Sequence, residues 1–154
     1  MIGSVVVMNP WTGGILALAS TPTYNQLAAA TNPKYNARLY TDPRHLLVNR
    51  AIAGVYPTGS TFKPIIAEAA LATGLITPST PLLCSGAFAL GGTVFHNVEA
   101  GVFESMSLPT ALSQSCDTWF YRLGDRFWWR DPAKRGIQIQ QWAHKLGVGV
   151  PTGI

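Results

Sequence analysis

Residues 56–64 read Tyr56-Pro57-Thr58-Gly59-Ser60-Thr61-Phe62-Lys63-Pro64 and join a turn to the start of a helix. The Pro-Thr-Gly segment is typical of a turn, and residues 62–71 are rich in strong helix formers. Pro64 is tolerated in the first helical turn, where its missing N–H would have no partner, and Gly74 is placed to end the helix. The pattern therefore predicts that Ser60 lies at the N-terminus of a buried helix.

Ser60 and Lys63 are three positions apart, so on a helix they lie on one face and the ammonium can reach the hydroxyl. A serine nucleophile needs a base, and a lysine whose charged form is disfavoured by burial or by nearby positive charge can serve. Backbone N–H groups at a helix N-terminus can also stabilise an oxyanion. The spacing alone is common by chance, and it favours the simpler interpretation that Ser60 caps a helix and Lys63 is a solvated cation.

The other predicted elements flank this turn. Residues 4–9 and 15–19 are apolar runs separated by turn residues, and we expect a β-hairpin with both faces buried. Residues 20–42 read as a long irregular connection, and residues 78–103 as loops with one short strand. Three further helices are expected, over residues 107–113, 116–127 and 137–146.

Composition indicates one globular domain with a charge-poor surface. At 154 residues the chain is long enough for a single core. Charged residues make up 12% of it, about half of the roughly 25% that is usual for soluble domains. Such a surface is expected where more protein covers it, or where the chain works next to a membrane or a polymer.

Charge, hydropathy and cysteine spacing exclude several partners. The net charge is +4, but the basic residues are scattered singly apart from Lys134-Arg135, so no nucleic-acid partner is expected. The longest apolar stretch, residues 64–75, contains Glu68 and is too short to span a bilayer, so no transmembrane segment is expected. Cys84 and Cys116 show no C-x-x-C spacing, so we expect no metal or other cofactor, and they leave the compartment open.

The residues around Ser60 resemble the active-site run of class B penicillin-binding proteins, in which Pro-x-Gly-Ser-Thr-x-Lys is usual and S-x-x-K is the nucleophile motif. Asn49-Arg50-Ala51 and the run over residues 6–20 look like that family as well. Ser115-Cys116-Asp117 resembles its second motif, S-x-N, with Asp in place of the commoner Asn. That variant is closer to the penicillin-binding protein 2 subgroup, the elongation-type enzymes.

The resemblance implies an α+β fold of the β-lactamase and transpeptidase type. Residues 1–154 would be the N-terminal portion of one transpeptidase domain, a β-hairpin plus a helical region, truncated before the C-terminal strands and the third motif, K-T-G. Ser60, Lys63 and Ser115 would be catalytic, with Ser115 lying across from Lys63 and relaying protons, and the substrate-binding residues would be Gly59, Thr61 and Asp117. Without the K-T-G strand and its oxyanion-hole donor, this chain alone is expected to be inactive.

The function implied by the resemblance is a peptidoglycan D,D-transpeptidase that is acylated on serine by D-Ala-D-Ala stem peptides and by β-lactams. It would act at the extracytoplasmic face of the bacterial inner membrane, anchored upstream, with cell-wall elongation proteins as partners. A D,D-carboxypeptidase and a serine β-lactamase remain alternatives within the same chemistry. A non-catalytic β-lactam sensor or an inactive binding module is the alternative of another class.

Several residues keep two interpretations. An ionised Asp117 near Lys63 would oppose the use of that lysine as a base, unless Asp117 is protonated, faces the substrate, or pairs with Lys63 only after proton transfer. Asp117 could also cap the helix that follows it. The pair Trp128-Trp129 fits either an exposed partner-binding patch or, as the favoured interpretation, packing at a helix end. His96 and His144 have no ligand-spaced companions.

Overall fold

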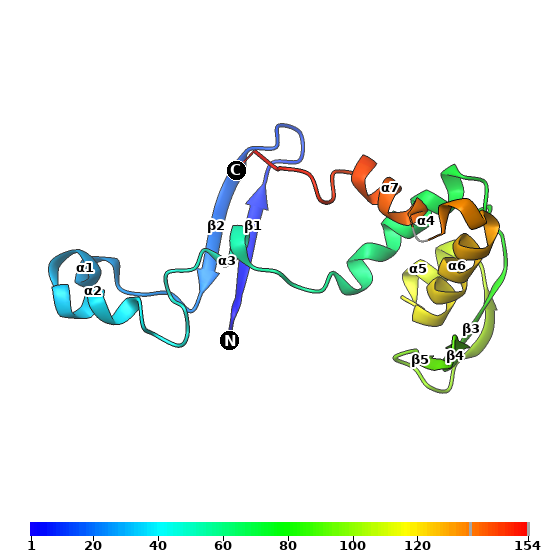
Figure 1. Ribbon diagram of the computed structural model, residues 1–154, viewed down its shortest axis with the longest axis horizontal. Helices are drawn as coiled ribbons and strands as arrows, with labels where there is room; N and C mark the ends of the chain where they lie inside the picture. Colours follow the sequence, from blue (N-terminus) through cyan, green and yellow to red (C-terminus); the bar gives the residue numbers. More distant parts are fainter. Residues whose placement is uncertain (136, 154) are drawn as a thin grey trace. The chain divides into compact units, whose positions relative to one another are not determined.

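The computed structural model describes residues 1–135 and 137–153, which form two compact units, Met1–Pro57 and Thr58–Gly153 (Figure 1). The expectation that the chain is the front part of a single domain stays a prediction. None of the helices in the described residues is long and apolar enough to cross a membrane.

The first unit is built on the predicted β-hairpin, in which β1 (Gly3–Met8) pairs antiparallel with β2 (Ile15–Thr21). The expected burial of both faces is wrong, because Val5 is 61% and Leu16 is 70% exposed. The helix that contacts both strands, α3 (Arg50–Ala53), has only four residues and covers little of a two-stranded sheet. The β-branched residues therefore set the strand conformation without being buried.

Two short helices occupy the segment that was expected to be irregular, so that prediction is wrong. These are α1 (Gln26–Thr31) and α2 (Pro33–Leu39). The Asn25 side chain accepts a hydrogen bond from the N–H of Ala28 (2.9 Å), and Asn32 caps α2 in the same way. The asparagines that resemble loop residues in the sequence are N-caps.

The second unit contains the helices that the sequence predicts. The Ser60 turn is a short 3-10 helix, η1 (Gly59–Phe62), followed by α4 (Lys63–Ala72), and Gly74 takes the left-handed backbone conformation (φ +66°) after it. The remaining helices are α5 (Leu108–Ser113), α6 (Asp117–Arg130), the short 3-10 helix η2 (Pro132–Lys134) and α7 (Gln138–Lys145). The predicted helices are confirmed, and α6 runs three residues further than expected.

Three short strands and the first residue of a fourth lie in residues 78–103, where one strand was expected, which corrects that prediction. The strand β3 (Leu82–Ser85) pairs antiparallel with β6 (Phe103–Met106), and β4 (Ala87–Leu90) pairs with β5 (Thr93–His96). Each has four residues, too few for an alternating pattern to show in the sequence. Gly91 and Gly92 both have positive φ, as the tight turn between β4 and β5 requires.

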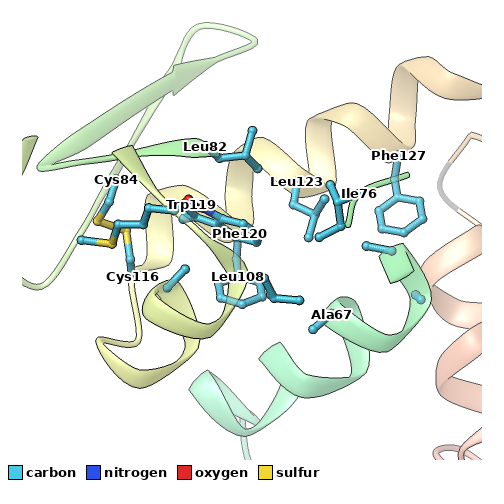
Figure 2. Close-up of a cluster of buried hydrophobic side chains, with 14 residues drawn as sticks. Ala67, Ile76, Leu82, Cys84, Leu108, Cys116, Trp119, Phe120, Leu123 and Phe127 are labelled. Atoms are coloured by element: carbon cyan, nitrogen blue, oxygen red, sulfur yellow. Dashed lines mark hydrogen bonds between the residues drawn. A yellow bond between two sulfur atoms is a disulfide. The ribbon is translucent and has the colours of Figure 1, made fainter. Parts of the chain in front are cut away.

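The core of the second unit is centred on α6 (Figure 2). The Trp119 side chain is fully buried, and its Nε1–H donates to the backbone oxygen of Met106 (2.9 Å), so the indole is satisfied without water. The cluster draws residues from α4, β3, β6, α5 and α6; it comprises Ala67, Ala69, Ala70, Ile76, Leu82, Cys84, Met106, Leu108, Ala111, Cys116, Trp119, Phe120, Leu123 and Phe127. Packing around α6 therefore fixes α4 and the segment before α6 in one body.

Candidate active site

The Ser60 turn presents a hydroxyl at the exposed start of the helical region. Gly59 has φ +55°, a left-handed conformation that glycine adopts without strain. The Thr61 hydroxyl donates back to the backbone oxygen of Thr58, which closes the turn. Ser60 itself is exposed, and its hydroxyl is bound by a side chain far along the sequence.

Lys63 is buried, with 7% of its surface exposed, so the interpretation of this residue as a solvated cation is wrong. Its Nζ donates to the backbone oxygen and to Oγ of Ser115, the latter at 2.9 Å, and it forms an ion pair with Asp117 Oδ1 at 2.6 Å. An ammonium has three N–H donors. All three are therefore engaged by the second motif, and the cation lies 5.7 Å from the centre of the Phe120 ring.

Ser115 connects the lysine to the nucleophile. Its hydroxyl donates to Ser60 Oγ at 3.0 Å while accepting from Lys63. Among the described residues Lys63 makes no direct hydrogen bond to Ser60, although the spacing suggested one; Ser115 lies across from Lys63, as the resemblance implies, and connects the two residues. Ser115 has φ +55°, a conformation that costs a non-glycine residue of order 1 kcal/mol or more.

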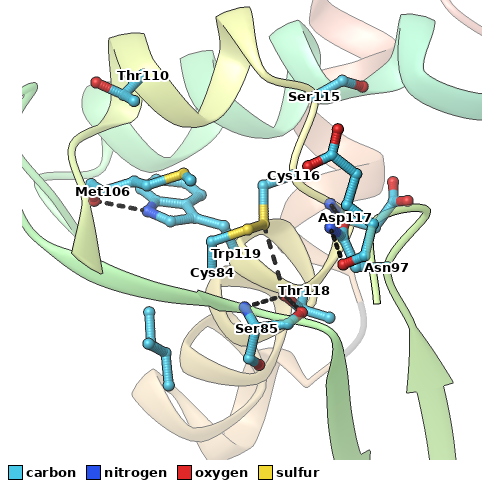
Figure 3. The surroundings of a disulfide bond; sticks show 12 residues. Cys84, Ser85, Asn97, Met106, Thr110, Ser115, Cys116, Asp117, Thr118 and Trp119 are labelled. Atoms are coloured by element: carbon cyan, nitrogen blue, oxygen red, sulfur yellow. Dashed lines mark hydrogen bonds between the residues drawn. A yellow bond between two sulfur atoms is a disulfide. The ribbon is translucent and has the colours of Figure 1, made fainter. Parts of the chain in front are cut away.

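Asp117 is the first residue of α6, and the alternative that it caps this helix is wrong. The cap position is Cys116, and the Asp117 carboxylate binds Lys63 instead. The backbone N–H of Asp117 donates to Asn97 Oδ1 at 2.8 Å (Figure 3). Asn97, which follows β5, therefore fixes the backbone that carries the carboxylate.

A disulfide between Cys84 and Cys116 joins β3 to the residue between Ser115 and Asp117 (Figure 3). Next to it the buried Thr118 hydroxyl donates to the backbone oxygen of Ser85 and accepts from its N–H, at 2.7 and 2.9 Å. This bond was not predicted from the sequence. The available signal was the implied extracytoplasmic location, since two cysteines in an oxidising compartment favour pairing.

Ser60 and Ser115 both line one cavity of about 180 Å³. Its wall also includes Asn97, Glu99 and Asp117. Asn97 and Glu99 were not predicted from the sequence, because the segment that contains them reads as a loop and the contact of Asn97 with α6 spans twenty positions. Gly59 and Thr61 shape the turn below Ser60, and their role as substrate-binding residues stays a prediction.

Two features outside the cavity also bear on the sequence predictions. Trp128 is 46% and Trp129 is 61% exposed, so packing at the helix end was the wrong choice; the Arg135 guanidinium lies over both rings. His144 Nδ1 lies 2.9 Å from the backbone oxygen of Val148.

Within residues 1–135 and 137–153 no group of three His, Cys, Asp or Glu side chains is placed to hold a metal ion.

Several known proteins are similar to this chain in both sequence and fold. The family model for the penicillin-binding protein transpeptidase domain matches residues 3–154. The peptidoglycan D,D-transpeptidase MrdA of Escherichia coli K12 is 37% identical over 98% of this chain and 23% of its own length. The peptidoglycan D,D-transpeptidase PbpA of Mycobacterium tuberculosis is 40% identical over 80% of this chain and 27% of its own length. The chain thus spans about a quarter of the length of these relatives.

The structure of penicillin-binding protein A from M. tuberculosis, solved as its ceftriaxone acyl-enzyme complex, superposes with a TM-score of 0.82 at 35% identity, covering 97% of this chain and 34% of that one. A serine on a helical turn, hydrogen-bonded through a second serine to a buried lysine in an α+β fold, is the arrangement typical of serine acyltransferases with an S-x-x-K motif. The chain belongs to the penicillin-binding protein transpeptidase family, in its class B penicillin-binding protein 2 group. The predicted family and fold class are confirmed.

Proposed function

We propose that the protein carrying this chain is a peptidoglycan D,D-transpeptidase, with Ser60 as the nucleophile. The observation that carries the proposal is the hydrogen-bonded series from Lys63 through Ser115 to Ser60, whose two serines line a cavity at the start of α4. The relatives MrdA and PbpA are named peptidoglycan D,D-transpeptidases, which supports this reaction for the protein. The substrate is a stem peptide that ends in D-alanyl-D-alanine.

Acylation begins when Ser60 Oγ attacks the carbonyl carbon of the D-alanyl-D-alanine peptide bond. The Oγ–C bond forms, and the hydroxyl proton passes to Ser115, which passes its own proton to Lys63. Two changes are needed, because in the resting arrangement Ser115 donates to Ser60 and Lys63 is a fully engaged ammonium. The hydrogen bond between the serines must reverse, and Lys63 must release a proton, for which Asp117 Oδ1 at 2.6 Å is the adjacent acceptor.

The second half of acylation uses the same groups in the opposite direction. As the C–N bond breaks, Lys63 returns a proton through Ser115 to the nitrogen of the departing D-alanine. Backbone N–H groups of the Ser60 turn face the developing oxyanion. An amine of a neighbouring stem peptide then attacks the ester carbon, forms the cross-link and restores the Ser60 hydroxyl. Asp117 is thus the residue that sets when Lys63 is free to accept a proton.

The location we propose is the extracytoplasmic face of the bacterial inner membrane. The Cys84–Cys116 disulfide supports it, because such bonds persist in oxidising compartments. A solved relative at 32% identity is described as part of a peptidoglycan synthase complex, which supports cell-wall synthesis proteins as partners. A relative acylated by ceftriaxone supports β-lactams as covalent ligands of Ser60.

The proposal is tested by labelling the full-length protein with fluorescent penicillin. We expect a covalent label on the wild type and its loss in Ser60→Ala, because the ester bond cannot form without Oγ. The matched control is Ser113→Ala, an exposed serine on α5 whose hydroxyl donates to the Thr110 backbone oxygen and lies outside the cavity. A wild type that takes no serine-dependent label would overturn the enzyme proposal and favour a non-catalytic binding module.

The fate of the acyl-enzyme separates the alternatives within this chemistry. With a peptide donor and an added amine, a transpeptidase forms an amide product as well as the hydrolysis product. Hydrolysis alone would indicate a D,D-carboxypeptidase, and rapid release of hydrolysed penicillin would indicate a β-lactamase.

A further inference from the structure

Asn97 caps α6 from outside the helix. The residue at the cap position, Cys116, makes no side-chain hydrogen bond to the helix, and its sulfur is bonded to Cys84. The N–H of Asp117 instead donates to Asn97 Oδ1 at 2.8 Å, across twenty positions of sequence (Figure 3). The first N–H groups of a helix have no partner within it, so a side-chain oxygen that accepts from one of them stabilises the helix start. Asn97 therefore fixes the point at which α6 begins.

Asn97 is itself held by two further hydrogen bonds. Its backbone N–H donates to the Gly86 backbone oxygen at 2.9 Å, and its Nδ2 donates to the Glu99 backbone oxygen at 3.3 Å. The turn that follows Asn97 packs directly against Gly86, because a Cβ added to that glycine would overlap the backbone of Ala100. The acceptor oxygen of Asn97 is therefore placed by a packed segment of backbone.

Three consecutive residues at the start of α6 are each tied to residues 84–86, at the end of β3. The ties are a disulfide, a pair of hydrogen bonds through Asn97 and a pair of hydrogen bonds from a hydroxyl; in that order they join Cys116 to Cys84, Asp117 to Gly86 and Thr118 to Ser85. The tie through Asn97 is the one that holds the residue whose carboxylate binds Lys63.

The segment that Asn97 holds supplies the partners of Lys63. The ammonium donates to the backbone oxygen and to Oγ of Ser115 and pairs with Asp117 Oδ1 at 2.6 Å. Ser115 has φ +55°, a conformation that persists only where surrounding contacts hold it. Its hydroxyl donates to Ser60 Oγ at 3.0 Å, so a displacement of about 1 Å in this segment takes the two hydroxyls out of hydrogen-bond range.

We propose that Asn97 is a positioning residue for the acylation of Ser60. Its role is to hold the backbone of Asp117 and thereby to keep Ser115 in contact with both of its partners. This inference rests on the proposed transpeptidase function. One helix-capping hydrogen bond corresponds to a factor of about three to thirty in an equilibrium constant. Loss of that bond should lower the population of the reactive arrangement, and with it the rate of acylation, by about the same factor.

The test measures acylation of the full-length protein over a series of fluorescent penicillin concentrations, which separates the limiting rate from the half-saturating concentration. In Asn97→Ala we expect the limiting rate to fall about three- to thirtyfold and the half-saturating concentration to stay unchanged, because the lost interaction acts on the transition state. The disulfide and the Thr118 contacts remain in this variant, so the fold should persist, and thermal unfolding checks this.

Asn97→Asp separates the two side-chain contacts of Asn97. It keeps an oxygen for the N–H of Asp117, at a helix N-terminus that favours an anion, and it loses the donor to Glu99. This variant should therefore retain most of the wild-type rate. A rate as low as that of Asn97→Ala would overturn the proposal, because the turn at Glu99 and not the start of α6 would then be what matters.

A double-mutant cycle tests whether Asn97 acts through Ser115. In a Ser115→Ala background, Asn97→Ala should lower the rate by less than about twofold, since residues of one hydrogen-bond network are not additive. The control is Asn25→Ala, which removes an equivalent acceptor from α1, bonded to the N–H of Ala28 at 2.9 Å and outside the cavity. It should leave the acylation rate unchanged.

The remaining outcomes each decide the matter. Equal fold losses with and without the Ser115 hydroxyl would overturn the proposal. A higher half-saturating concentration with an unchanged limiting rate would also overturn it, as would a lower unfolding temperature alone, since these indicate a ligand contact or a purely structural role. Failure of the wild type to label with penicillin would instead refute the transpeptidase proposal itself, so the two failures are distinguishable.

Discussion

Ser115→Ala is the change that bears most directly on the relay. It removes the oxygen that accepts from Lys63 at 2.9 Å and donates to Ser60 at 3.0 Å. A hydrogen bond to a charged group contributes about 1.5–3 kcal/mol and a neutral one about 0.5–1.5 kcal/mol. If both act in the transition state, acylation should slow by about 10²–10³-fold, within the usual range for proton transfer by a positioned side chain.

The assay is the second-order rate constant for labelling by fluorescent penicillin in the full-length protein. Lys63 keeps the Ser115 backbone oxygen and Asp117 as partners in this variant, so the fold should persist. Circular dichroism and thermal unfolding check that point, and Ser113→Ala serves again as the control. An acylation rate equal to that of the wild type would refute the relay, because Lys63 would then have to act on Ser60 directly.

Two further predictions concern stability and charge. Cys84→Ala, or reduction of the disulfide, should lower the stability of the second unit by about 3–4 kcal/mol, since the bond closes a loop of 32 positions. Chemical denaturation with and without reductant measures it, and an unchanged midpoint would contradict the bond. In the first unit, the side-chain hydrogen bond from Arg44 lowers the pKa of Asp42 from 3.8 to about 2. Because this folded pKa is depressed, the pair stabilises above about pH 4 and the contribution disappears as the pH falls through about 2; Arg44→Ala should return the Asp42 pKa toward 3.8 in an NMR titration.

The sequence predicted the features that are local in the chain. The helix after Ser60 follows from residues within ten positions of each other, and the same holds for α5, α6 and α7. The hairpin of β1 and β2 is equally local, because its turn residues lie between its strands. The wrong prediction there was that both faces of the hairpin are buried. Burial depends on what packs against the strands and not on the residues of the strands themselves.

The features that the sequence missed depend on contacts between distant positions. The pairing of β3 with β6, the Cys84–Cys116 bond and the contact of Asn97 with α6 each join residues that are about twenty or more positions apart. In the candidate site, the motifs pointed to Ser60, Lys63, Ser115 and Asp117, and the resemblance placed Ser115 across from Lys63, whereas the spacing alone suggested a direct contact between Lys63 and Ser60. Burial of Lys63 against the second motif became visible only when both helices were placed.

Lys63 takes all three of its hydrogen-bond acceptors from residues that follow it by more than fifty positions. During synthesis the Ser60 turn emerges before the residues that connect it to Lys63. A chain folded only through α4 presents a serine without a hydrogen-bonded path to a lysine, and α6 must dock before that path exists. Under the proposed function, the reactivity of Ser60 is therefore a property of tertiary assembly, acquired late in folding.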